Sequence, residues 1–282
     1  MTSTTNTVVV PLDGSRVSEN ALPYVGAVAK ASGAAVRFVH VVDEDAARND
    51  ADFARAKQVF AEYVTGLAKD HLPAGIEHSV AMLKGAAAKE ILNLAADATM
   101  IVISTHGAGG IKAAVIGSVT DKVVRGTTVP VLVIPGTDGA AVQPSKKAVL
   151  IAVDGSAEAE QGLVKGREFA SWLGAPVVLV RSYSIPVPVG TEFVYYPADQ
   201  AEIFEKAAKD YVAGAAKATE KSYVVHGPAA QSIEDTAEEL DAQAVVVSSH
   251  GKGFAARIAL GSTTDRLMHS MKRPLLVVPV KS

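Results

Sequence analysis

The sequence predicts an α/β protein made of two tandem, doubly wound, five-stranded parallel sheets. Short apolar, β-branched runs alternate with amphipathic helical stretches along the whole chain. Every connection between successive runs is long enough to cross back over a sheet, as parallel strands require. The same order of elements occurs twice, so we expect two copies of one domain.

Composition limits the classes of partner. The chain has 282 residues, 49% of them hydrophobic, and a formal net charge of -3. We therefore expect two globular domains and no bulk attraction to nucleic acid or to an anionic membrane. No run of about 18 apolar residues and no basic leader appear, which predicts no membrane span, no signal peptide and a cytoplasmic location. The absence of cysteine excludes disulfides, cysteine zinc sites and thiol catalysis.

Matching positions in the two halves define the repeat. Segments 8–15 and 149–156 both end in Asp-Gly-Ser, with Asp13 and Asp154 141 positions apart. The later pair, Gly117 and Gly261, is 144 positions apart. The join falls in the small and polar residues 136–144, which predicts domains at residues 1–138 and 145–282.

The first half opens with a continuously apolar run, residues 8–12, of the kind that is buried on both faces of a parallel sheet. A turn and helix cap follow at residues 13–15, and one apolar helical face covers residues 17–29. Pro23 fits this helix only near its first turn, and Gly33 ends the helix. The same periodicities predict further strands at residues 36–42, 76–82, 99–103 and 129–134, and helices at residues 47–69, 86–96 and 118–125.

The second half repeats this order. It predicts strands at residues 148–153, 176–182, 222–225, 244–247 and 275–280, and helices at residues 158–173, 199–217, 230–240 and 262–271. Its connection at residues 183–197 is rich in proline and aromatic residues and longer than its counterpart. This connection is a lid over the second site, a contact surface, or a loop packed on its own side chains.

Each half contains a strand, a glycine-bearing loop and a helix N-terminus in succession. Unpaired main-chain N–H groups and the positive end of the helix dipole can bind phosphate there without a cluster of arginines. The hydroxyls of Ser118 and Ser262 would each add a donor. Ligands of such sheets lie outside the carboxyl ends of the strands, so Asp13 and Ser104 are expected to share one crevice. The basic residues in or near these loops that could reach phosphate are Lys112, Lys252 and Arg257.

These features resemble the universal stress protein family over nearly the whole chain. The likeness rests on the Asp-Gly-Ser turn, on V-H-V-V-D at residues 39–43, on S-T-H-G-x9-G-S at residues 104–118 and on V-P-V-L-V-I-P at residues 129–135. Nucleotide-binding members carry G-x2-G-x9-G-[S/T] and typically bind ATP, whereas Ser104 and Ser248 replace the first glycine here. The resemblance implies an adenine nucleotide alpha hydrolase-like fold, with strand order 3-2-1-4-5 and the halves paired through their last strands.

The resemblance also implies an adenine nucleotide site in each half. A carboxylate would contact the ribose, the main chain would edge the adenine, and the glycine loop would hold the phosphates of ATP, with or without Mg²⁺. The implied residues are Pro11, Leu12, Asp13, Val41, Ile103, Ser104, Gly107, Gly117, Ser118 and Val119 in the first half, and Val153, Asp154, Ser182, Val247, Ser248, Gly251, Gly261, Ser262 and Thr263 in the second.

The implied function is that of an ATP-binding stress-response regulator with little or no hydrolysis. Two alternatives stay open: a slow ATPase or adenylyl-transferring enzyme, and an interaction module that binds no nucleotide, which the lost first glycine favours. The chain lacks the P-loop, G-x-S-x-G and H-E-x-x-H patterns, so we assign no catalytic or metal residue. His106 and His250 are expected to hold the loops by ring hydrogen bonds. The tandem chain is also a candidate homodimer.

Overall fold

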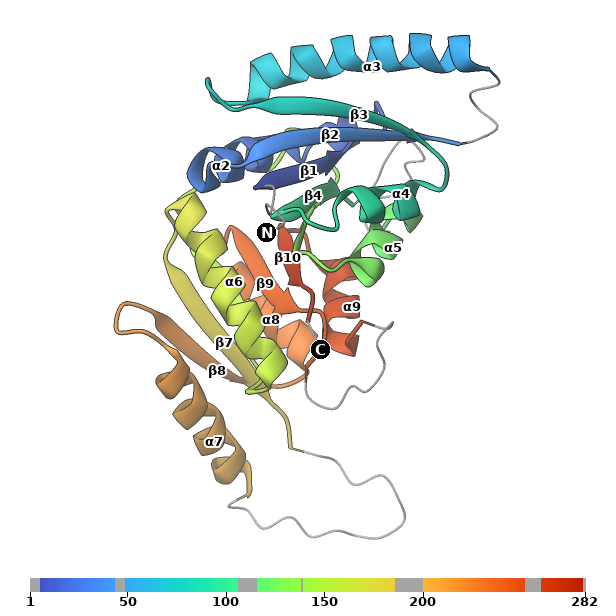
Figure 1. The fold of residues 1–282 in the computed structure, drawn as a ribbon. Coiled ribbons are helices and arrows are strands. Elements are labelled where there is room, and N and C mark those ends of the chain that lie inside the picture. The colour runs from blue at the N-terminus through green and yellow to red at the C-terminus, as the bar shows by residue number, and fades with distance from the viewer. Residues whose placement is uncertain are drawn as a thin grey trace, which may run out of the picture.

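One continuous sheet of ten strands crosses the whole protein, in the order β3-β2-β1-β4-β5-β10-β9-β6-β7-β8 (Figure 1). The computed structural model describes residues 6–43, 49–105, 116–137, 139–185, 200–251 and 260–280. The strands are β1 (Thr7–Pro11), β2 (Ala35–Val42), β3 (His78–Lys84), β4 (Met100–Ser104), β5 (Val131–Ile134), β6 (Val149–Ala152), β7 (Val177–Tyr183), β8 (Lys221–His226), β9 (Ala244–Ser248) and β10 (Leu275–Val278).

Each half keeps the strand order 3-2-1-4-5 that the family resemblance implied, and its strands pair in parallel. The two five-stranded sheets are joined edge to edge, because β5 and β10 pair antiparallel with Leu132 opposite Leu276. Pairing through the last strands is therefore confirmed. The two five-stranded sheets thereby form one continuous sheet, since both β5 and β10 are apolar and each buries the open edge of the other.

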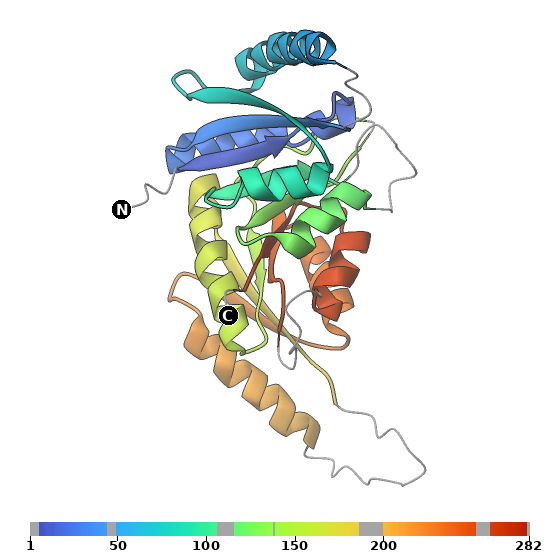
Figure 2. The same ribbon diagram turned by 45° about the vertical axis from the view of Figure 1, so that its right-hand side comes forward.

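Helices cover both faces of this sheet. They are α1 (Arg16–Glu19), α2 (Leu22–Ser32), α3 (Asp50–His71), α4 (Ala87–Leu94), α5 (Ser118–Gly126), α6 (Ala157–Leu173), α7 (Gln200–Ala215), α8 (Ala229–Glu239) and α9 (Ser262–Ser270). One apolar layer joins the sheet to α2, α3, α6 and α7, and the other joins it to α4, α5, α8 and α9. Figures 1 and 2 place α3 and α7 at opposite ends of the molecule. No helix among the described residues is long and apolar enough to cross a membrane.

The helix expected at residues 17–29 is in fact two helices. Ser15 caps α1 by accepting a hydrogen bond from Ser18 N at 3.1 Å, and α1 ends at Glu19. Pro23 has no N–H to donate to the carbonyl of Glu19 four residues earlier, and its ring crowds that carbonyl. The chain therefore restarts as α2, with Pro23 in its first turn, and α2 ends at Gly33 in the left-handed region with φ of 67°.

The remaining elements lie within a few residues of their predicted positions, because their signals are local. Helix α6, for example, begins after the cap residue Ser156 and ends at the left-handed Gly174. The connection at residues 183–197 lies largely outside the described residues, since β7 ends at Tyr183 and the description resumes at α7. Its three interpretations stay predictions.

Candidate functional site

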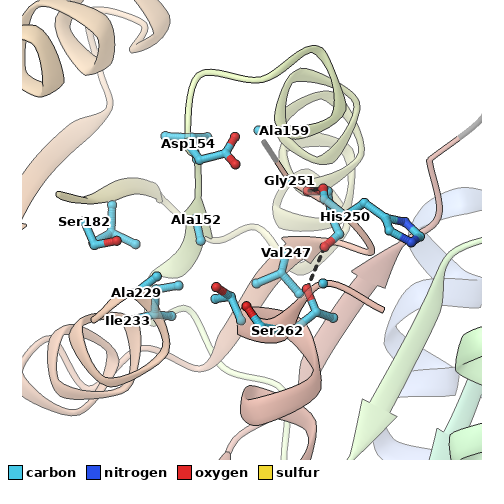
Figure 3. Close-up of a pocket in the computed structure, with 16 residues that line it drawn as sticks. Ala152, Asp154, Ala159, Ser182, Ala229, Ile233, Val247, His250, Gly251 and Ser262 are labelled. Atoms are coloured by element: carbon cyan, nitrogen blue, oxygen red, sulfur yellow. Dashed lines mark hydrogen bonds between the residues drawn. The ribbon is translucent and has the colours of Figure 1, made fainter. Parts of the chain in front are cut away.

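A cavity of about 170 Å³ lies at the carboxyl ends of the second-half strands β6, β7 and β9 (Figure 3). The first turns of α6, α8 and α9 close it from the other side, through Ala159, Ala229 and Ser262. This position is the one at which doubly wound sheets bind ligands, because the helix N-termini and the strand ends point to the same side. The fold thus brings residues from three strands and three helices together.

Asp154 enters this cavity from the turn after β6. Its Oδ1 atom accepts hydrogen bonds from the main-chain N of Ser156 at 2.9 Å and from the Ser156 hydroxyl at 2.5 Å. Ser156 Oγ in turn accepts from Ala159 N at 3.0 Å and so caps α6. Gly155 makes the turn possible with φ of 79°, a conformation that favours glycine. The carboxylate is therefore held rigidly at the rim of the cavity.

Gly251 lies against the same carboxylate. A β-carbon at residue 251 would be 2.3 Å from Asp154 Oδ2, well inside the van der Waals limit. Any other side chain at residue 251 would have to displace Asp154 or the loop. The motif glycine therefore allows the loop to approach the carboxylate in its present position.

The N-terminus of α9 faces the cavity without a side-chain cap. Gly261 is its N-cap residue and provides no side-chain hydrogen bond, and the first helical residues, Ser262 and Thr263, line the cavity. The first-turn N–H groups have no partner within their own helix, so they are suited to binding an anion. Two bonds fix this helix to strand β9: Gly261 N donates to Ser249 O at 2.8 Å, and Thr264 Oγ1 donates to Ser248 O at 2.8 Å.

Ser248 stands where the family motif has its first glycine, yet its hydroxyl supports the loop. Ser248 Oγ donates to His250 O at 2.6 Å (Figure 3). His250 Nδ1 lies 3.0 Å from Ser249 Oγ, a ring hydrogen bond within the loop of the kind that the sequence predicted. The replacement of glycine by serine is thus accommodated, because the added hydroxyl is satisfied by the loop itself.

The first half repeats this construction. Asp13 Oδ1 accepts from Ser15 N at 3.0 Å, Gly117 N donates to Thr105 O at 2.6 Å, and Thr120 Oγ1 donates to Ser104 O at 2.8 Å. One difference is the Ser104 hydroxyl, which is buried and has no hydrogen-bond partner among the described residues. The two serines that replace the motif glycine therefore have different surroundings.

The structure places the predicted residues as follows. All nine predicted residues of the second half line the one cavity: Val153, Asp154, Ser182, Val247, Ser248, Gly251, Gly261, Ser262 and Thr263. In the first half, the predicted residues lie on the neighbouring strands β2, β1 and β4, on the turn after β1 and at the start of α5; they are Pro11, Leu12, Asp13, Val41, Ile103, Ser104, Gly117, Ser118 and Val119. His106, Gly107, Lys112, Lys252 and Arg257 lie outside the described residues.

Sequence reasoning missed several residues of the site. Ala229 and Ile233 form a wall from α8, and Ala152 and Val180 add apolar contacts from β6 and β7. Small and aliphatic residues of this kind occur throughout the chain, so nothing singles these four out. The buried hydroxyl of Thr264 was detectable, because a threonine follows the Gly-Ser pair by two residues in both halves.

Comparison with known proteins identifies the family. The model of the universal stress protein family matches residues 4–135 and again residues 146–279. A universal stress protein of Mycobacterium bovis is 27% identical over 291 residues, which cover 96% of each chain. One of Mycobacterium tuberculosis is 26% identical over 304 residues, which cover 97% of this chain and 95% of the relative.

A solved structure confirms the tandem fold. The crystal structure of a universal stress protein from Archaeoglobus fulgidus is similar with a TM-score of 0.72 and 21% sequence identity, over 98% of both chains. At this identity the likeness concerns the fold alone. The two matches to the family model show that this chain belongs to the universal stress protein family, with the family domain present twice.

Proposed function

We propose that this protein is an ATP-binding stress-response regulator whose nucleotide occupancy sets its conformation or its contacts with partners, with little or no hydrolysis. The observation that carries the proposal is the convergence on one cavity of a carboxylate, a glycine loop and an uncapped helix N-terminus. These three groups match the ribose and the phosphates of one nucleotide.

Each part of the nucleotide would have a partner in the cavity or at the start of α9. Val247, Ala229 and Ile233 supply apolar walls for the base, and Asp154 is the acceptor for the ribose hydroxyls. The first-turn amides of α9 and the hydroxyl of Ser262 are the donors for phosphate oxygens. Because pockets for whole ligands usually measure ~300–1,000 Å³, the base and ribose would occupy this cavity of about 170 Å³ and the triphosphate would extend along the start of α9.

Mg²⁺ would accompany the nucleotide through its phosphate oxygens, which commonly supply the ligands of this ion together with water. The described residues contain no group of three or more His, Cys, Asp or Glu side chains that could hold a metal. The chain's own role in this proposal is to orient the nucleotide.

Hydrolysis or adenylyl transfer would need a base beside the reacting phosphate. Among the described residues that line the cavity, the ionisable side chains are Asp154 and His250. Asp154 is held in the turn before α6, and the ring of His250 contacts Ser249 within the loop. With Asp154 assigned to the ribose, His250 is the one ionisable side chain among the described lining residues left to act as such a base, and its Nδ1 atom is engaged by Ser249; we therefore favour a regulator over an enzyme.

Isothermal titration calorimetry with ATP and Mg²⁺ tests the proposal. We expect saturable binding below millimolar nucleotide, weakened by Asp154→Asn; the matched first-half variant Asp13→Asn shows whether the other half also binds. No heat of binding at millimolar ATP would overturn the proposal in favour of an interaction module. Single-turnover assays with labelled ATP address the enzyme alternative, since turnover above about 1 per second would reject the regulator.

A further inference from the structure

The two helices whose first turns are suited to phosphate lie side by side where the halves meet. Figures 1 and 2 both show α5 next to α9. Each helix begins at a Gly-Ser pair without a side-chain cap, and each carries one aspartate in its first turn, Asp121 in α5 and Asp265 in α9. These aspartates are 144 positions apart, so they occupy corresponding places in the repeat.

One arginine pairs with both aspartates. Arg125, in the last turn of α5, donates from Nε to Asp121 Oδ1 at 2.8 Å and from Nη2 to Asp265 Oδ1 in the other half. Among the described residues, it is the one cation that forms an ion pair with either carboxylate. The charge balance of both first turns therefore depends on a single guanidinium.

Asp265 is close to the groups that would bind phosphate. It follows Ser262 by three residues, so its Cα lies ~4.5 Å farther along the helix axis. The free amides at a helix start carry about half of an elementary positive charge, which attracts phosphate. A carboxylate beside them repels phosphate instead. The pair with Arg125 offsets this repulsion, because the guanidinium brings a positive charge to the carboxylate.

The repeat does not supply a second arginine. The counterpart of Arg125 in α9 is His269, 144 positions later. Its Nδ1 atom lies 2.8 Å from the main-chain O of Asp265, within its own helix. A histidine ring carries no permanent charge. The first half therefore provides the permanent positive charge that compensates Asp265 in the second half.

We propose that Arg125 is a positioning residue for the nucleotide site of the second half and acts on the phosphates through Asp265. By holding this carboxylate in an ion pair between the halves, Arg125 keeps its charge from opposing phosphate at the start of α9. The affinity of the second-half site is thereby set in part by a side chain of the first half. This inference rests on the proposed function, because it concerns the phosphate end of the same site.

The variant Arg125→Met tests the inference when ATP and adenosine are compared by calorimetry. The full chain is used in the Asp13→Asn background, which should weaken the first-half site so that the heat reports the second. ATP should bind roughly two- to five-fold more weakly, as expected for a partly exposed ion pair. Adenosine has no phosphate, so its affinity should not change. The loss for ATP should disappear at about 1 M salt, where the Debye length is only ~3 Å.

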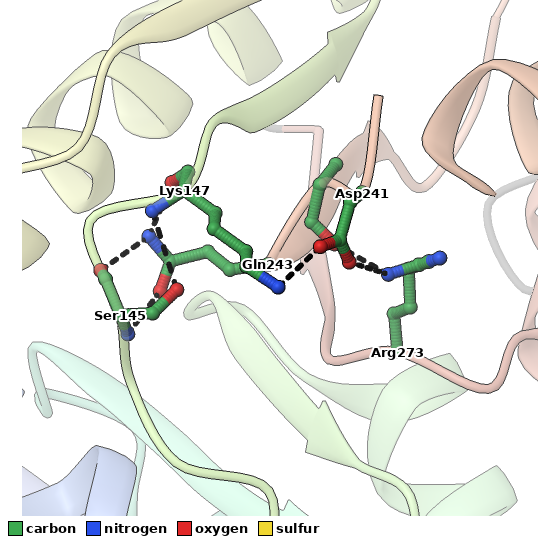
Figure 4. A network of polar contacts seen from close by, with 6 residues as sticks. Ser145, Lys147, Asp241, Gln243 and Arg273 are labelled. Atoms are coloured by element: carbon green, nitrogen blue, oxygen red, sulfur yellow. Dashed lines mark hydrogen bonds and ion pairs between the residues drawn. The ribbon is translucent and has the colours of Figure 1, made fainter. Parts of the chain in front are cut away.

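The variant Asp265→Asn distinguishes an electrostatic role of Arg125 from a structural one. Without the carboxylate, Arg125 has no charge to compensate at α9, so the double variant Arg125→Met, Asp265→Asn should bind ATP as tightly as Asp265→Asn alone. The control is Arg273→Met, which removes an arginine side chain of similar exposure, 25% against 32%, from its pair with Asp241 (Figure 4). Neither Arg273 nor Asp241 lines the cavity, so this variant should keep the wild-type affinity for ATP.

The outcomes separate this inference from the proposed function. Three results would overturn the inference and leave the proposed function standing: an unchanged ATP affinity in Arg125→Met, an equal loss of ATP and adenosine affinity, or a double variant that binds ATP more weakly than Asp265→Asn. Absence of ATP binding by the wild-type protein at millimolar nucleotide would overturn both.

Discussion

Asp154 and Gly251 are 97 positions apart in the chain, yet a β-carbon on Gly251 would lie 2.3 Å from the Oδ2 atom of Asp154. The loop after β9 and the turn after β6 are thus packed so closely that a side chain at residue 251 would have to displace the Asp154 carboxylate or the loop. The other oxygen of this carboxylate, Oδ1, accepts hydrogen bonds from the main-chain N and the hydroxyl of Ser156. The geometry of the cavity therefore depends on this contact.

Gly251→Ala is expected to weaken ATP binding by about ten-fold, because displacing the carboxylate or the loop costs about 1–3 kcal/mol. Calorimetry with ATP measures this loss. The matched control is Gly214→Ala in α7, where an added β-carbon meets no atom within 4 Å and should leave affinity unchanged. Wild-type affinity in the Gly251 variant would show that the contact does not shape the site.

The variants Asp154→Asn and Asp154→Ala should separate the contribution of Asp154 to ATP binding from its contribution to stability. Asparagine keeps an oxygen that accepts from Ser156 N, so the thermal midpoint should change little, while the loss of charge should weaken ATP by about ten-fold or more. Alanine removes the acceptor as well and should also lower the free energy of unfolding. Two variants with the same ATP affinity as the wild type would mean that Asp154 serves only the turn before α6.

The two threonines that tie helix to strand should contribute equally to stability. Thr264→Val and Thr120→Val each remove a hydrogen bond of 2.8 Å from a buried threonine to the preceding strand, and each should lower the free energy of unfolding by about 1–2 kcal/mol. Urea denaturation measures both. Thr65→Val is the control, since the exposed Thr65 makes the same kind of hydrogen bond within α3. This substitution should lower the free energy of unfolding by less than ~0.5 kcal/mol. A loss as small as that in the control would contradict the prediction.

Arg125 links the two halves. It donates to Asp121 in its own helix, with 2.8 Å between Arg125 Nε and Asp121 Oδ1, and to Asp265 in α9. Because the Arg125 and Asp265 side chains are 32% and 41% exposed, water screens the pair. A double-mutant cycle of Arg125→Met and Asp265→Asn should therefore give a coupling of only about 0.5–1 kcal/mol, which falls with added salt. Zero coupling at low salt would show that this link does not stabilise the interface.

Glu220 should make stability depend on pH in the acid range. Arg167 donates to both carboxylate oxygens at 2.8 and 2.6 Å, and these hydrogen bonds lower the pKa of Glu220 from its ordinary value. Its contribution is therefore fully present above its unfolded pKa, ~4.3, and is lost as pH falls through the folded value.

The measurement is the free energy of unfolding of the wild type minus that of Glu220→Gln. We expect a difference of about 1–3 kcal/mol at pH 7 that shrinks as the pH is lowered below about 4. The exposed Glu239, changed to Gln, should give a small difference at every pH. A Glu220 difference that stays constant down to pH 3 would contradict the assignment of the ion pair.

The amino-acid sequence alone accounts for the elements and their repetition. Apolar runs, helical periodicity and cap residues such as Ser156 and Gly174 act within a few residues, so they locate each strand and helix from local signals. The repeat also singles out Asp154, Gly251 and Gly261, because each has a counterpart in the first half. The resemblance to the family also predicted that the two halves pair through their last strands.

How separate segments meet depends on the tertiary structure. The register of Leu132 against Leu276, the approach of Gly251 to Asp154 and the wall that Ile233 adds from α8 all depend on distances between segments far apart in the chain. Local propensity carries no information about such contacts, because they are set by how the layers pack and by which connection the chain happens to contain.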